Sequence, residues 1–172
     1  MAQIRFRPLQ LGDAEGLDFA QRIMAREQYA FAFHYQPGQD FVAYLQLLED
    51  WRLGRNPRPG SVASSYEVGV LDDRIAVRLS VRHALNDFLF QQGGHIGYAV
   101  LPEFRGLGFG FAALRRGLQM TSSLGIERTL VTCDEDNPVS RHIIEKTGGR
   151  YESSYVGPDV VVPVRRYWFE TS

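Results

Sequence analysis

The spacing of apolar and polar residues predicts strands in several parts of the chain. Short alternating runs are typical of half-buried strands, and the Asp72-Asp73 pair between two of them is typical of a hairpin turn. A longer connection over residues 84–94 precedes the next strand. The predicted strands cover residues 3–8, 66–71, 75–81, 95–101, 128–133, 150–157 and 161–169.

Four other segments carry apolar residues at helical spacing. Asp13 is expected to cap the first, and Asn137 followed by Pro138 is a typical start for the fourth. Gly125 stands where a left-handed residue commonly ends a helix. The predicted helices run from Asp13 to about Met24, over 39–53, over 108–124 and from Asn137 to Gly148. This order of strands and helices, with hairpins on both sides, predicts a mixed α/β sheet.

Length, charge and cysteine content argue against nucleic-acid, metal and membrane functions. The chain has 172 residues and a net charge of −1, so we expect a single domain over residues 1–172 and no nucleic-acid partner. Cys133 is the one cysteine, which excludes an internal disulfide and a cysteine metal cluster, and no metal is predicted. The sequence lacks an apolar run of about 18 residues and the apolar core of a signal peptide. We therefore expect no membrane partner and a cytoplasmic location.

The most informative segment is the glycine-rich turn at residues 102–110, Pro-Glu-Phe-Arg-Gly-Leu-Gly-Phe-Gly. It lies between a predicted strand and a predicted helix, so its backbone N–H groups and the helix N-terminus can converge on an anion. A pyrophosphate is the expected anion. The chain has no Gly-Lys-Ser/Thr that would make this a P-loop. The alternative is a plain strand–helix connection that binds nothing.

Residues 105–110 resemble the (Gln/Arg)-x-x-Gly-x-(Gly/Ala) signature of the GNAT superfamily, the acyl-CoA-dependent N-acetyltransferases. Residues 136–149 resemble the second cofactor-facing segment of that family. Residues 94–98 together with 144–146 resemble a bacterial branch of predicted acetyltransferases with no assigned substrate. The resemblance implies the GNAT fold, a central mixed, mostly antiparallel sheet flanked by about four helices, with acetyl-CoA as co-substrate.

The resemblance also implies roles for individual residues. The backbone N–H near Ala99 or Val100 would polarise the thioester carbonyl, and Leu101 would continue the pairing with the pantetheine arm. Arg105 could instead be a solvated loop residue, and Asn137 could act only as a helix cap. The implied cofactor-binding residues are Val100, Leu101, Arg105, Gly106, Leu107, Gly108, Phe109, Gly110, Asn137 and Ser140.

The acid and base are less clearly marked. Many GNAT enzymes have a tyrosine acid where this chain has Ile144, so that role is vacant or filled elsewhere. His95 is the candidate general base, since histidine titrates in the useful range; the alternative is a packed histidine bonded to backbone. His83 and His34 are further options. Cys133 is expected to be a small buried side chain.

These observations predict transfer of an acetyl group from acetyl-CoA to a primary amine of a small molecule or peptide, by direct attack. The alternatives are a non-catalytic acyl-CoA sensor and a transferase that uses a longer acyl-CoA. The aromatic cluster over residues 29–35 lies where the GNAT fold covers the acceptor, although core packing also explains such a run. A homodimer is a further expectation from the family.

Overall fold

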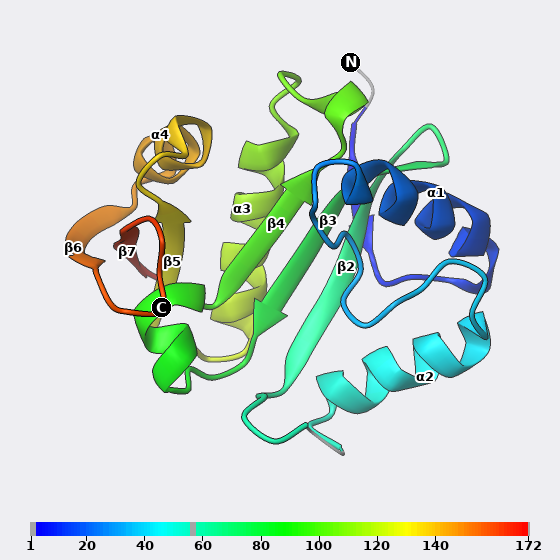
Figure 1. Ribbon diagram of the computed structural model, residues 1–172, viewed down its shortest axis with the longest axis horizontal. Helices are drawn as coiled ribbons and strands as arrows, with labels where there is room; N and C mark the ends of the chain where they lie inside the picture. The colour runs from blue at the N-terminus through cyan, green and yellow to red at the C-terminus, as the bar shows by residue number, and fades with distance from the viewer. Residues whose placement is uncertain (1–2, 56–57, 172) are drawn as a thin grey trace.

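The computed structural model describes residues 3–55 and 58–171, which form two antiparallel sheets with helices on both faces (Figure 1). The strand order is β1-β2-β3-β4 in the first sheet and β5-β7-β6 in the second. The strands are β1 Arg5–Arg7, β2 Ser64–Leu71, β3 Arg74–Arg82, β4 Ile96–Val100, β5 Arg128–Asp134, β6 Arg150–Tyr155 and β7 Val164–Glu170.

The helices cover both faces of the first sheet. In Figure 1, α1 and α2 lie to the right of β2, and α3 lies behind β4. The helix α1 contacts β3, α2 contacts β2, and α3 contacts both β3 and β4. Asn137 caps α4 as the sequence predicts, since its side chain accepts a hydrogen bond from the N–H of Ser140, and Asp40 caps α2 by accepting one from the N–H of Ala43. The expected side-chain cap of Asp13 on α1 is wrong, because the Asp13 carboxylate accepts hydrogen bonds from Arg7 and from the N–H of Gln10 instead. The α-helices are α1 Ala14–Ala25, α2 Phe41–Arg52, α3 Phe109–Ser123 and α4 Pro138–Thr147.

The predicted hairpin is confirmed. Leu71 pairs with Arg74, and both Asp72 (φ 47°) and Asp73 (φ 59°) are left-handed, as the two central residues of a type I′ turn must be. The hairpin carries alternating side chains to two apolar clusters. One cluster lies between the first sheet and α1 and α2, and the other lies among α3, α4 and the strands β5 and β7.

Several boundaries differ from the sequence prediction. The connection over 84–94 contains one turn of π-helix, Leu89–Gly93, which apolar spacing does not reveal. Strand β1 ends before Pro8 and β7 begins after Pro163, because proline has no N–H to give to a ladder. Across the described ranges 3–55 and 58–171, no helix combines the length and apolar character needed to cross a membrane.

The expected central sheet is divided between β4 and β5. At the start of β4, the N–H of His95 donates to the carbonyl oxygen of Leu130 (2.7 Å). The N–H of Leu130 in turn donates to Nδ1 of His95 (2.9 Å). Beyond this junction the two strands belong to separate sheets, and they diverge toward the glycine-rich turn (Figure 1). The wedge between them is where the GNAT resemblance places the cofactor.

Candidate active site

A cavity of about 950 Å³ occupies the wedge between the sheets. Its walls come from β4 (Tyr98, Ala99 and Val100), from the glycine-rich turn with the first residues of α3, and from the start of α4 (residues 137–140). The structure therefore brings together the strand, the turn and the Asn137 segment, which are separated by about forty residues in the sequence.

The glycine-rich turn has the backbone of an anion cradle. Gly106 (φ 76°) and Gly108 (φ 83°) are left-handed, and a Cβ on either would meet no atom within 4 Å, so the space in front of them is open. In the described part of the chain, the N–H groups of Gly106, Leu107 and Gly108 donate to no protein acceptor. The N–H groups of Phe109 and Gly110 belong to the first turn of α3, where no intrahelical acceptor exists. These five N–H groups are available to an anion.

Gly110 is needed for a different reason. It is helical, and a Cβ there would lie 2.6 Å from Cδ1 of Ile143 on α4. Its small size therefore lets α3 and α4 approach each other at the wall of the cavity. Leu107 is 60% exposed and is not among the residues that line the cavity.

The register of β4 decides which backbone N–H faces the wedge. The N–H of Leu101 donates to the carbonyl of Ala76 (2.9 Å) and the carbonyl of His95 accepts from Arg82 (2.8 Å), so alternate residues of β4 pair with β3. Between these two positions Gly97 and Ala99 lie in the same alternation, so their backbone polar groups face β3, and those of Tyr98 and Val100 face the wedge. Of the two expected donors, Val100 rather than Ala99 therefore faces the wedge. The N–H of Leu101 donates to Ala76 and its carbonyl accepts from Phe104 (2.9 Å), so both of its backbone groups already have partners within the protein.

Arg105 differs in part from its expected role. Its N–H donates to the carbonyl of Pro102 (3.3 Å), so it is not a free donor of the cradle. Its guanidinium pairs with Glu27, which follows α1 (2.6 Å), and its Nε donates to the carbonyl of Val100 (3.2 Å). The hydrogen bond from Arg105 holds the pKa of Glu27 below its ordinary value. Arg105 thus joins the end of β4 to the segment after α1, and its half-exposed side chain lines the cavity.

Asn137 and Ser140 line the cavity as expected. The side-chain oxygen of Asn137 accepts the N–H of Ser140 (3.0 Å), which leaves its amide NH₂ free to donate. The hydroxyl of Tyr98 lies 3.4 Å from that of Ser140, across the wedge. Burial raises the pKa of Tyr98, so its hydroxyl is protonated at neutral pH. Sequence reasoning missed Tyr98, although it is the one hydroxyl-bearing residue of the cofactor strand.

His95 matches the packed-histidine alternative better than the catalytic one. It is 5% exposed, its Nδ1 accepts the N–H of Leu130, and it does not line the cavity. Burial and the charge of Arg82 lower the pKa of His95, so the imidazole is neutral. Through its two hydrogen bonds with Leu130, His95 joins the two sheets at the narrow end of the wedge.

Cys133 and Ile144 are both buried side chains of the core. Burial raises the pKa of the Cys133 thiol to about 11, so it is protonated and a poor nucleophile. Ile144 is fully buried in the cluster beneath α4. The position where many family members carry a tyrosine therefore serves packing in this chain.

The family model described as the acetyltransferase (GNAT) domain matches residues 3–150. The chain belongs to the GNAT acetyltransferase family. No curated protein matches it.

Solved structures agree with this assignment at the level of the fold. The chain is similar to yncA of Salmonella typhimurium, solved with acetyl-CoA (13% identity, TM-score 0.65, 98% of this chain and 94% of the other). It is similar to Mycobacterium smegmatis RimJ with CoA-disulfide (20%, 0.68, 97% and 81%). It is also similar to spermidine N-acetyltransferase of Vibrio cholerae with CoA and spermine (17%, 0.62, 98% and 96%). This GNAT protein therefore has the expected fold, with an acetyltransferase domain over most of its length.

Proposed function

We propose that this GNAT protein transfers the acetyl group of acetyl-CoA to a primary amine by direct attack, without an acyl-enzyme. The observation that carries the proposal is the row of five unpaired N–H groups from Gly106 to Gly110, at the end of a strand in which the N–H of Val100 faces the wedge. Similar folds solved with acetyl-CoA or CoA support the choice of co-substrate.

The residues present fit that co-substrate. The open space before Gly106 and Gly108 accommodates a diphosphate, which the N–H groups and the positive end of the α3 dipole would hold. The free amide of Asn137 would donate to the pantetheine arm. When bound, acetyl-CoA supplies an activated acetyl group as a thioester.

The N–H of Val100 would stabilise the negative charge that develops on the thioester oxygen during attack. A fixed donor at that point lowers the barrier, because it needs no reorganisation when charge forms. The protonated hydroxyl of Tyr98 would give a proton to the departing thiolate, with Ser140 holding its orientation. The attacking amine would lose one proton to water as the C–N bond forms and the C–S bond breaks, and Tyr98 would regain its proton from water. Tyr98 would thus supply the acid that Ile144 cannot.

Calorimetry with acetyl-CoA and a thiol-release assay over a panel of amines test the proposal. We expect acetyl-CoA to bind and thiol to be released only when an amine is present. Absence of acetyl-CoA binding would refute the proposal. Binding without turnover on any amine would indicate the sensor alternative, and tighter binding of a longer acyl-CoA would indicate a different donor.

A further inference from the structure

A second cavity, of about 400 Å³, adjoins the first on the acceptor side. The two share Tyr29, Tyr98, Asn137 and Ser140, so they meet beside the point where the thioester would lie. A third cavity of about 350 Å³ continues beyond Phe33 and Arg82, which line both the second and the third. An amine that reaches Tyr98 from this side passes along the front face of β3.

Two arginines of β3, Arg78 and Arg82, line the second cavity. Arg78 is only 2% exposed, and its guanidinium lies over the rings of Phe33 (4.6 Å) and Tyr29 (5.3 Å). It also donates to the hydroxyl of Tyr29, while its Nε is buried without a hydrogen-bond partner. A buried guanidinium with an unused donor is an unusual and costly arrangement, which an anionic ligand would relieve.

Arg82 is placed next to the cofactor strand. A Cβ on Gly97 would lie 3.0 Å from Nη1 of Arg82, so the guanidinium packs against β4 at a residue that has no side chain. Its hydrogen bond is a long one, from Nη1 to the carbonyl of Gly93 (3.4 Å). Burial and the charge of Arg78 lower the pKa of Arg82 to about 10, which still leaves it protonated at neutral pH.

Carboxylates do not neutralise these arginines. None of the ion pairs found over residues 3–55 and 58–171 includes Arg78 or Arg82, nor Arg58 of the third cavity. Asp134, an exposed residue, supplies a carboxylate to the lining of the second cavity.

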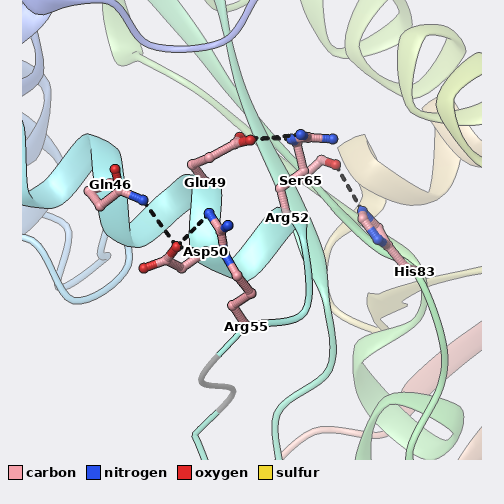
Figure 2. A network of polar contacts seen from close by, with 7 residues as sticks. All are labelled: Gln46, Glu49, Asp50, Arg52, Arg55, Ser65 and His83. Atoms are coloured by element: carbon pink, nitrogen blue, oxygen red, sulfur yellow. Dashed lines mark hydrogen bonds and ion pairs between the residues drawn. The ribbon is translucent and has the colours of Figure 1, made fainter.

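Three acids on nearby elements already have partners. Glu27 pairs with Arg105 on the cofactor side. On α2, Glu49 pairs with Arg52, and Asp50 accepts from Arg55 and Gln46, as Figure 2 shows. Arg78 and Arg82 therefore outnumber Asp134 in the lining of the second cavity, and the described lining of the third cavity holds Arg58 and Arg82 with no carboxylate.

We infer that the acceptor is a small primary amine that also carries an oxyanion, a carboxylate or a phosphate, which Arg78 and Arg82 bind. This inference rests on the proposed acetyl transfer and names the class of its acceptor. A guanidinium binds either oxyanion through paired N–H donors. The same charges disfavour a polycation such as spermine, which the Vibrio cholerae relative binds.

The cofactor does not account for these charges. Arg78 and Arg82 do not line the cavity that holds the glycine-rich turn, and the N–H groups of that turn already provide a diphosphate site. The contacts of Arg78 with Tyr29 and Phe33 explain how its guanidinium is held, but its Nε still has no hydrogen-bond partner. An anion on the acceptor fits both arginines at once.

The test compares amines that differ only in charge. The probes are β-alanine and β-alaninamide, L-amino acids and their amides, O-phosphoethanolamine and ethanolamine, and spermine. Binding is measured by calorimetry with and without coenzyme A, and kcat/KM by thiol release from acetyl-CoA. The variants are Arg82→Gln, Arg82→Lys and Arg78→Gln. Arg55→Gln is the matched control, because Arg55 lies outside the cavities and pairs with Asp50.

We expect the anionic member of at least one pair to be favoured by about 10- to 100-fold, the size of a charge-assisted contact. Arg82→Gln should abolish this preference, mainly through KM, while Arg82→Lys retains part of it and Arg55→Gln all of it. Circular dichroism reports whether Arg78→Gln folds; if it does not, the Arg82 variants decide.

Two outcomes overturn the inference. One is equal or better use of the neutral amides or of spermine, with acetyl-CoA turnover intact. The other is that no anionic amine binds the protein with or without coenzyme A. If acetyl-CoA itself fails to bind, the proposed transfer is refuted, and calorimetry on the free protein still decides whether an anionic amine binds through Arg82.

Discussion

The substitution Gly108→Ala separates the backbone role of the glycine-rich turn from its role toward the cofactor. Gly108 has φ 83° and open space around its missing Cβ, so alanine causes no clash within the protein. The left-handed conformation alone should lower the free energy of unfolding by about 1 kcal/mol. For a chain of this size that lowers Tm by about 2–4 °C. The added methyl would also project into the open space in front of the turn.

The same helix offers a matched control. Gly125 follows the other end of α3 with φ 74°, and a Cβ there also meets nothing within 4 Å. Gly125→Ala should therefore lower Tm by a similar amount. Only Gly108→Ala should weaken acetyl-CoA binding, by about 10- to 100-fold, since it obstructs hydrogen bonds to a charged group. Differential scanning calorimetry and titration calorimetry measure the two effects. Equal acetyl-CoA affinity in the two variants would refute the cradle.

Three other predictions test individual side chains. Tyr98→Phe should leave acetyl-CoA affinity unchanged and reduce kcat by roughly 100-fold if the hydroxyl is the acid; an unchanged kcat in steady-state assays excludes that role. Asn137→Ala should lower the free energy of unfolding by about 1 kcal/mol through the lost cap. Asn137→Asp keeps the cap, so weaker acetyl-CoA binding with normal stability in urea melts would show that the amide contacts the cofactor. Because the lowered pKa of His95 keeps it neutral when folded, the unfolded state binds more protons as pH falls below about 6.5 and stability drops there. His95→Asn should flatten that pH dependence of the urea midpoint. If the variant instead loses the acidic side of the pH–rate profile, His95 acts as the general base.

Local sequence features were enough to predict much of the fold. The Asp72-Asp73 turn, the Asn137-Pro138 helix start and the glycine after α3 are signals contained in a few neighbouring residues, and the structure confirms them. The glycine-rich turn was evident from its own glycines and its place between a strand and a helix, and the family resemblance implied its role toward the cofactor.

The rest depended on information that is not local. Whether Ala99 or Val100 faces the wedge is set by which residues of β3 pair with β4, and a change of one residue reverses the answer. The partner of Arg105 is Glu27, which is 78 positions away. The charge of the acceptor side arises because β3 places Arg78 and Arg82 on one face, and no spacing rule marks two arginines as unpaired.

The junction of His95 with Leu130 gives the two sheets a shared pivot. Farther along, the separation between β4 and β5 is set by side chains where α3 meets α4, notably Gly110 against Ile143, since no ladder bonds span the gap in the described chain. A slight rotation about the pivot would change the width of the slot without breaking a backbone bond. A substitution that changes the packing of α3 against α4 should therefore change the affinity for the thioester arm, even when the substituted residue does not contact that arm.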